Sequence, residues 1–479
     1  MKRSLMPEDR LQALTRRVRD GMRRLGEPAR PWTTLPAGID ADVLIVGAGQ
    51  CGLAAAFALK RAGVGAIRLV SRDAAGAEGP WRSFARMPTL RSPKTAPGPE
   101  LGLPDLTYEC WHKAVYGDAA YDALDLIHTE DWALYIDWFR EVVDLPIDRN
   151  RSLVDLDGTE ARVVARFSDG GSLSARQVVL ATGMDALGGP AIPRTFARLP
   201  EALRPHCYGP IDFDALNGRR VAVIGAGSTA FDNAAEALEA GAGAVDLYCR
   251  EPALRAVNHM KGVADYGAVA HWADFDDAAR WRFARLGASR SAPPTGPTVA
   301  RAVRWPNFRI LLRADIRAAG QTAKGVEIDA SGVRRVYDRV LIATGYGVDP
   351  DARPETARLQ AAMARWSDRY QPPPGDADPT LAAYPYLTPG FAFVPRDPKA
   401  APWLDRVRLF AGPTVASMGR IAGESGNLRY GAPRLATAVC RALALEDRDA
   451  LFDRAAAYDV RETEFEDYAA RTHPADEPD

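Results

Sequence analysis

The hydrophobic pattern of the chain centres on two strand–turn–helix units about 180 residues apart. The first apolar run, Val43–Val46, enters the turn Gly47-Ala-Gly49-Gln50-Cys-Gly52 and then an alanine-rich helical stretch. The second run, Val221–Ile224, enters Gly225-Ala-Gly227-Ser228-Thr229-Ala230 and another helical stretch. A Gly-x-Gly-x-x-Gly/Ala turn between a buried strand and a helix predicts a dinucleotide-binding unit.

The residue types in these turns have physical reasons. The first glycine allows the tight turn, and the second lets the backbone approach a pyrophosphate. The small third residue lets helix and strand pack closely, and the helix N-terminus attracts the phosphates. Two such units predict two nucleotides in one protein, the usual purpose being hydride transfer from one to the other.

A repeated strand indicates how the two units are connected. The run 177–181 ends at Thr182-Gly183, and a near copy, 339–343, ends at Thr344-Gly345. The two copies bracket the second glycine turn, which predicts that the second domain is inserted into the first. The predicted fold class is α/β, with two Rossmann-like dinucleotide-binding domains, an N-terminal helix and an irregular lid.

Other patterns set the expected boundaries. An apolar stripe from Leu11 to Leu25 predicts an N-terminal cover helix, and helical spacing of aromatic residues predicts a core helix over 131–143. A proline-rich and aromatic segment predicts an ordered lid or substrate wall, with a purely structural excursion as the alternative. The predicted division begins with a helical cover at 1–36 and the first part of the FAD domain at 37–190. The NADP domain with an insertion follows at 191–335, and the second part of the FAD domain, with the lid at 351–403, at 336–472. The acidic tail beyond 472 is expected to fray.

Composition narrows the function classes. The 479 residues carry a net charge of −1, from 61 basic and 62 acidic side chains, which gives no general attraction for nucleic acid or membranes. No apolar run approaches the roughly 20 residues of a bilayer span, and no signal peptide is evident, so a cytoplasmic protein is expected. Five scattered cysteines without a Cys-x-x-Cys pair argue against a disulfide reductase, and no histidine spacing indicates a metal.

The order of these motifs resembles the class B flavoprotein monooxygenases, which include flavin-containing monooxygenases, Baeyer–Villiger monooxygenases and ornithine and lysine N-hydroxylases. The resemblance covers roughly residues 40–440, and it includes a Gly79-Pro-Trp81-Arg82 stretch similar to one beside the flavin. It implies FAD in the first domain, NADP(H) in the second, and a C4a-(hydro)peroxyflavin that inserts one atom of O₂ into a small organic molecule. N-oxygenation and Baeyer–Villiger insertion both stay open, as does the oligomeric state.

The chain departs from that family at three places. Ser71-Arg72 stands where an acidic residue usually binds the FAD ribose, although Asp73 is near. Glu78-Gly79 replaces a Gly-Gly pair. His206-Cys-Tyr-Gly-Pro meets the Baeyer–Villiger fingerprint only in part.

The glycine turns, the strand ends and the resemblance together define the predicted cofactor sites. For FAD the expected residues are Gly47, Gly49, Gln50, Gly52, Ser71, Arg72, Trp81, Arg82, Val154, Thr182, Gly183, Gly412, Asn427 and Leu428. For NADP they are Gly225, Gly227, Ser228, Thr229 and Arg250. Arg250 ends the second strand of its unit, where an arginine would pair with the 2′-phosphate of NADP; Glu251 would instead indicate NAD.

Four residues are candidates for the reacting centre. Arg91 and Lys94 lie in a basic loop after Trp81, where a cation would stabilise a reduced flavin; phosphate or surface contacts are the alternative. Asn258 and His259 follow the NADP unit and would face the nicotinamide, unless they are structural. Asn427 has a plain helix cap as its alternative.

Two rival functions share the same motifs. A hydride-only FAD oxidoreductase with a small-molecule acceptor would use both glycine turns equally well. A nucleotide-binding protein without enzymatic activity is the second alternative, because Ser71 weakens the expected FAD contact.

Overall fold

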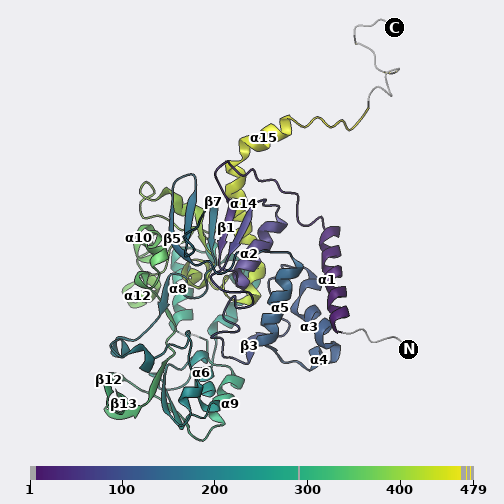
Figure 1. Cartoon of the computed structure of the whole chain (residues 1–479). Coiled ribbons are helices and arrows are strands. Elements are labelled where there is room, and N and C mark those ends of the chain that lie inside the picture. The colour runs from purple at the N-terminus through teal and green to yellow at the C-terminus, as the bar shows by residue number, and fades with distance from the viewer. Residues whose placement is uncertain (1–6, 290–291, 465–470, 472–474, 476–479) are drawn as a thin grey trace, which may run out of the picture.

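The computed structural model describes residues 7–289, 292–464, 471 and 475. Figure 1 shows two sheet-containing lobes, one above the other, with α15 (Arg448–Ala456) projecting from the upper one. Residues 1–6 and most of the tail beyond 464, including nearly all of the part expected to fray, lie outside the described ranges. None of the described helices is long and apolar enough to cross a membrane.

The first sheet is assembled from distant parts of the chain. Its parallel core runs β2–β1–β7–β17, formed by β1 (Ala41–Val46), β2 (Ile67–Val70), β7 (Ser172–Leu180) and β17 (Val407–Leu409). The antiparallel strands β6 (Val163–Phe167) and β5 (Leu153–Gly158) extend it beyond β7. Because Val46 lies opposite both Val70 and Leu180, the carboxyl ends of the core strands form one edge. Open α/β sheets bind ligands at that edge.

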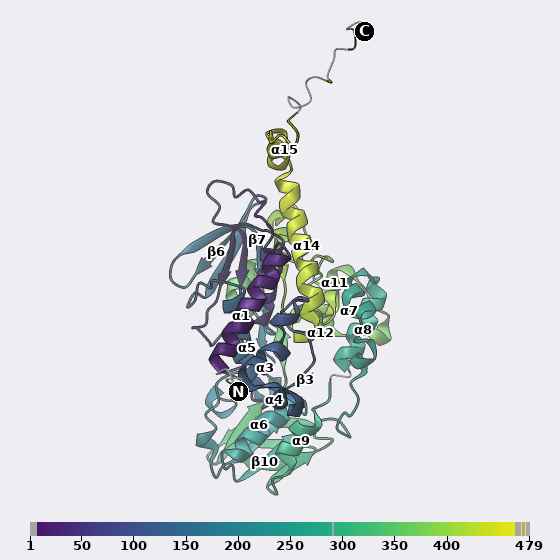
Figure 2. The ribbon, with the colours of Figure 1, turned by 90° about the vertical axis from the view of Figure 1, so that its right-hand side faces the viewer.

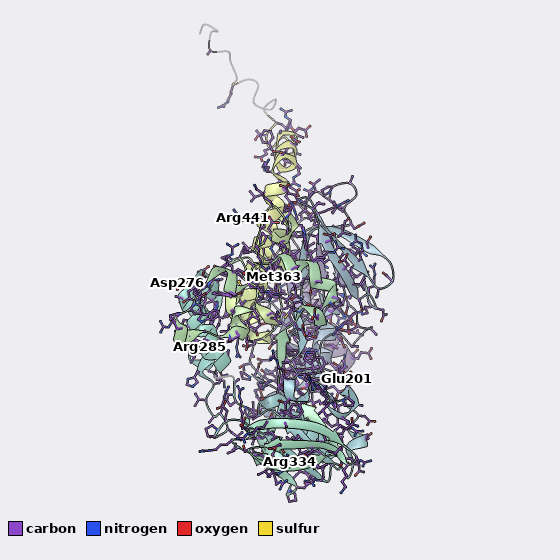
Figure 3. The ribbon with its side chains drawn as sticks, turned by 90° about the vertical axis from the view of Figure 1, so that its left-hand side faces the viewer. Glu201, Asp276, Arg285, Arg334, Met363 and Arg441 are labelled. Atoms are coloured by element: carbon purple, nitrogen blue, oxygen red, sulfur yellow. The ribbon has the colours of Figure 1, made fainter. Side chains whose placement is uncertain are left out.

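The second sheet has the parallel order β11–β10–β9–β15. Its strands are β9 (Arg220–Ile224), β10 (Ala244–Tyr248), β11 (Phe308–Leu311) and β15 (Arg339–Ile342), with α6 (Ser228–Glu239) and α9 (Gly296–Val303) packed together beside them. An antiparallel meander, β12 (Ile316–Thr322), β13 (Gly325–Ala330) and β14 (Val333–Tyr337), lies outside it, and Arg334 marks it in Figure 3.

One boundary differs from the sequence analysis. The strand 339–342 was assigned to the second part of the FAD domain, from 336 onward, but β15 pairs with β9 in the second sheet. The second lobe therefore extends past Ile342. The chain then returns through a two-stranded link, β8 (Gly188–Pro190) with β16 (Tyr346–Val348), before β17 rejoins the first sheet.

Helices cover one side of the first lobe, as Figure 2 shows. The predicted cover helix is α1 (Pro7–Arg24), which buries Leu14, Val18 and Met22 against α3 (Tyr108–Tyr116) and α5 (Thr129–Val142). Leu25 lies past the end of α1 and is exposed, so it does not belong to the stripe. The same lobe contains β3 (Thr89–Pro93), α4 (Asp118–Ala123) and β4 (Leu126–His128).

The insertion that follows β10, residues 258–289, packs on the first lobe and the lid rather than on the second sheet. Its helix α8 (Asp277–Ser289) packs on the lid and on α13 (Val415–Met418), and its helix α7 (Tyr266–His271) contacts α14 (Leu428–Glu446). The Trp366 indole donates to Ser417 Oγ at 3.0 Å, and the Trp281 indole donates to the Asp376 carbonyl at 2.8 Å. The lid itself folds into the short helices α10 (Ala357–Ala362), α11 (Trp366–Arg369) and α12 (Pro379–Ala382). We call this assembly, residues 258–289 with 351–403, the helical lobe; Asp276 and Arg285 mark it in Figure 3.

Candidate functional site

The first glycine turn has the geometry of an anion cradle. Gly47 has φ +106°, and a Cβ on it would lie 2.4 Å from the Ala181 carbonyl oxygen. A Cβ on Gly52 would lie 1.8 Å from the Gly47 oxygen, so only glycine lets α2 (Gln50–Arg61) approach β1 this closely. No side chain caps the N-terminus of α2, and its first turn has no acidic residue. Its free N–H groups are therefore available to a phosphate.

Two further segments reach the same edge. Thr182 and Gly183 follow β7, and the Gly183 carbonyl accepts a hydrogen bond from the Gly412 N–H at 3.1 Å. A Cβ on Gly412 would lie 2.7 Å from the Cα of Met184, so glycine is required for this contact. Met184, which no sequence pattern singled out, lies against Gly412 and is 54% exposed.

Gln50 ties the first turn to the segment that leads into α14 (Leu428–Glu446). Its Nε2 donates to the Gly423 carbonyl at 3.2 Å, and its Oε1 accepts the Trp132 indole N–H at 3.3 Å. Asn427 does not cap α14 through its side chain, because its Nδ2 donates to the Arg420 carbonyl at 3.0 Å. Leu428 is fully buried. The beginning of α14 is thus held next to the beginning of α2.

The segment after β2 carries two carboxylates, those of Asp73 and Glu78. Ser71 is buried, and its hydroxyl accepts the Asp73 N–H, while Arg72 is exposed and lies 3.6 Å from Asp73. Glu78 buries its carboxylate, which accepts the Gly76 N–H at 2.7 Å and pairs with Arg149 at 2.6 Å. Burial raises the pKa of Asp73, and the nearby charge of Glu78 adds to it.

A pocket opens beside the first turn. It is lined by Ala48, Leu53, Gly76, Glu78, Trp81, Arg82, Ala133, Ile136, Asp137 and Arg140. Trp81 meets Trp132 edge to face at 6.3 Å, and Arg82 forms an ion pair with Asp137 on α5 at 2.9 Å. Val154, on the edge strand β5, is 48% exposed and does not line this pocket.

The second glycine turn repeats the first. Gly225 has φ +123°, and a Cβ on it would lie 2.6 Å from the Ala343 carbonyl oxygen. Gly227 has no heavy atom within 4 Å of an added Cβ, and no side chain caps α6. The Ser228 hydroxyl is buried without a hydrogen-bond partner among the described residues, and Thr229 follows it in the first turn. An unpaired hydroxyl at an uncapped helix N-terminus fits a phosphate.

The charges around β10 distinguish the two possible nicotinamide nucleotides. Asp246, on the strand itself, is buried and binds Arg309 twice at 2.7 Å and the Tyr337 hydroxyl at 2.6 Å. Arg250 follows the strand with a side chain that is 86% exposed, 3.5 Å from Glu251. Asp246 is thus committed to the core, whereas Arg250 is available to a ligand.

The four residues expected at the reacting centre are not brought together. Arg91 is exposed on β3, and its charge acts on the buried Asp232 of α6, whose pKa burial raises to about 6. Lys94 donates to the Tyr121 and Asp122 carbonyls at 2.8 and 3.0 Å, which fastens the end of α4. Asn258 accepts the Met260 N–H and thereby caps the 3₁₀ turn that His259 begins. Lys94 and Asn258 therefore have structural partners.

Two titratable groups near the turns are held neutral. Burial lowers the pKa of His206 to about 4, and its Nδ1 accepts the Tyr208 N–H at 3.3 Å. The Tyr208 ring stacks on Tyr346 at 3.8 Å, so this partial fingerprint forms part of the link between lobes. Burial raises the pKa of Cys51 to about 11, which leaves it a packing thiol.

Comparisons with known proteins identify the family. Residues 44–263 match the model described as pyridine nucleotide-disulphide oxidoreductase. The chain is 37% identical over 458 residues to the FAD-dependent urate hydroxylase of Xanthomonas campestris pv. campestris, covering 94% of this chain and 97% of that protein. The chain belongs to this family of flavin-dependent monooxygenases. The prediction of an FAD-dependent monooxygenase is thereby confirmed, and the hydride-only and non-enzymatic alternatives are disfavoured.

Solved structures share the fold. L-lysine 6-monooxygenase from Pseudomonas syringae superimposes with a TM-score of 0.66 at 19% identity, covering 84% of this chain and 99% of that one. The ornithine hydroxylase of Pseudomonas aeruginosa gives 0.63 at 16% identity, covering 85% and 100%. The predicted fold class is therefore confirmed. At these identities the likeness concerns the fold alone.

Proposed function

We propose that this monooxygenase uses NADPH and O₂ to hydroxylate a flat, anionic oxopurine, with urate as the first substrate to test. The observation that carries the use of both FAD and NADPH is the pair of uncapped glycine-turn helices, one on each sheet. The urate hydroxylase relative, similar along almost the whole chain, supports the substrate class. Hydroxylation of a purine adds a third reaction type to the two expected from the sequence.

The residues of the first lobe fit FAD. The N–H groups at the start of α2 would bind its pyrophosphate, and the Ser71 hydroxyl with the Glu78 carboxylate would bind its ribose. The segments at Gly183, Gly412 and the start of α14 would surround its ring system. Bound FAD supplies the redox chemistry that activates O₂, while the protein positions the reactants and excludes water.

Arg250 tests the choice of NADPH. Replacing Arg250 by alanine is expected to raise the KM for NADPH roughly 10- to 100-fold, because charge-assisted hydrogen bonds contribute about 1.5–3 kcal/mol. The KM for NADH should stay unchanged, since NADH has no 2′-phosphate. Steady-state oxidation of both nucleotides measures this, with Arg317→Ala on β12 as an exposed-arginine control. An equal change for both nucleotides would contradict the assignment.

An aromatic corner next to the start of α14 supports a flat anionic substrate. Tyr266 of α7 is 62% exposed, and its ring meets Tyr430 edge to face at 5.4 Å. The guanidinium of Arg429, an exposed residue, lies 5.1 Å from the centre of the Tyr430 ring. A planar ring can stack on the exposed tyrosine face while the arginine binds its charge.

The experiment follows the oxygen atom. With purified holoenzyme, NADPH and ¹⁸O₂, urate is expected to yield a product with one labelled atom, the other atom leaving as water. NADPH use should match product one to one, and Tyr266→Ala should raise the KM for urate while Val333→Ala, on β14, should not. The proposal is wrong if NADPH oxidation with urate yields only hydrogen peroxide. A labelled product from ornithine, lysine or a ketone would then identify another substrate class.

A further inference from the structure

We infer that two copies of this chain associate by exchanging their C-terminal arms, each arm lying in a groove along α14 of the other copy. The arm is defined as residues 448–464, which comprise α15 and the described segment after it. This interaction surface lies away from the glycine turns, and it does not depend on the proposed substrate.

The groove is formed by helix surfaces of the first lobe. Its lining comprises Glu27, Trp32, Ala58, Arg61, Ala62, Leu101, Pro433, Ala436, Thr437, Cys440, Arg441, Ala444 and Leu451. The members on α14 are mostly small and recur every three or four residues, so they share one face of that helix. Small side chains on one wall and Trp32 with Leu101 on the others leave an apolar channel wide enough for larger side chains.

The arm exposes large apolar side chains that the small residues on the α14 wall of the groove could accommodate. Figures 1 and 2 show α15 and the residues after it extending away from both lobes. None of the nine residues of α15 is buried. Phe452, Tyr458 and Val460 are 72%, 67% and 62% exposed. An isolated helix this short is marginal in water, so it needs a surface to pack against.

The root of the arm is held at one end of its own groove, and the arm extends outward from there. Asp447 is buried and pairs with Arg176 at 2.7 Å, and it also accepts the Thr34 N–H at 2.9 Å. Arg454 donates to the Trp32 carbonyl at 3.2 Å, and Leu451 closes one end of the groove. The arm therefore starts beside the groove and points outward, which suits entry into the same groove of a second copy.

Symmetry and charge both favour a second copy of this chain as the occupant. Arm and groove lie on the same molecule, so one twofold axis satisfies both at once, as in the common closed dimers. Arg441 stands at the groove rim on α14, below the projecting α15 in Figure 3. The end of the arm carries Asp459, Glu462 and Glu464 against Arg461, so its net charge is opposite to that of Arg441.

The first experiment measures the oligomeric state of the full holoenzyme by sedimentation velocity. The wild type is expected at twice the chain mass of 51.9 kDa. Phe452→Asp in the arm and Thr437→Arg on the exposed face of the groove are each expected to give monomers with unchanged circular dichroism. Val333→Asp, at an apolar position that is 49% exposed on β14, is the matched control and should remain a dimer. A monomeric wild type, or dimers in both arm and groove variants, would overturn the inference.

A cross-linking experiment distinguishes the source of the occupant. Ala455→Cys places a thiol on the exposed arm, and native Cys440 lies in the groove. A short bis-maleimide should produce a covalent dimer on a denaturing gel, and the added Cys440→Ser change should abolish it. A product of monomer mobility whose tryptic map links residue 455 to Cys440 would show that the chain's own arm fills the groove, which overturns the exchange.

Discussion

Replacing Gly49 by valine is expected to give a folded, colourless protein. An added Cβ would have only the Gly79 Cα near it, at 3.8 Å, which is ordinary contact. The backbone of Gly49 is extended, with φ −71° and ψ −178°, so a β-branched residue adopts it without strain. The valine branches would instead occupy the space through which a pyrophosphate approaches the N–H groups of α2. We expect FAD binding to weaken roughly 1000-fold, about 4 kcal/mol.

The measurement compares the flavin absorbance of the purified variant with that of the wild type, followed by titration of the apoprotein with FAD. Circular dichroism and a single thermal transition establish that the variant is folded. Gly320→Val is the matched control, because Gly320 is also open to an added Cβ but lies on β12, away from both turns. A Gly49→Val protein that retains flavin at wild-type occupancy would remove the first turn from the FAD site.

The choice of Gly49 shows which parts of the site the sequence predicts well. A glycine turn between an apolar strand and a helix is a local signal, so its position and the strands beside it followed directly from residues a few positions apart. The structure adds the contacts that each glycine makes with the rest of the protein, which the local signal does not contain. Gly47 and Gly52 are required by contacts inside the protein, whereas Gly49 and Gly227 are not, so the latter two report on the ligand alone.

Pairing over long distances explains the boundary that was wrong. The strands that lead into Thr182 and Thr344 have nearly the same sequence, and nothing in either strand encodes its neighbour in a sheet. The first pairs with β1 and the second with β9, so their equivalence along the chain did not mean membership of one domain. The packing of the insertion at 258–289 could not be predicted for the same reason. Its helical pattern does not reveal that it packs on the lid.

Side-chain roles depended even more on the fold. Lys94 was placed near the flavin because of its basic loop, but the carbonyls at the end of α4 lie within reach of its ammonium group. From the sequence, Glu78 only replaces the first glycine of a Gly-Gly pair, but in the structure its buried carboxylate accepts hydrogen bonds from Arg149 and the Gly76 N–H. The partners of Lys94 and Glu78 are backbone groups or side chains distant in the sequence. Sequence patterns do not show such contacts.

Replacing Gly227 by valine is expected to separate the two nucleotide sites. No heavy atom lies within 4 Å of an added Cβ, and the extended backbone, φ −83° and ψ 177°, accepts valine. The first lobe does not change, so the variant should be purified with a full complement of FAD. The branches would block the approach of the NADPH pyrophosphate to α6 and to the unpaired Ser228 hydroxyl. We expect the apparent Kd for NADPH to rise roughly 100-fold, about 2.8 kcal/mol.

Anaerobic stopped-flow reduction of the bound flavin measures this Kd directly, from the dependence of the bleaching rate on NADPH concentration. Dithionite should reduce the variant fully, because it needs no binding site, and this shows that the flavin remains reactive. Gly320→Val is again the control and should bleach like the wild type. Unaltered NADPH dependence in Gly227→Val would mean that the nicotinamide nucleotide reaches the flavin without using α6. The opposite defects of Gly49→Val and Gly227→Val, one in flavin retention and one in flavin reduction, would assign each glycine turn to its own nucleotide.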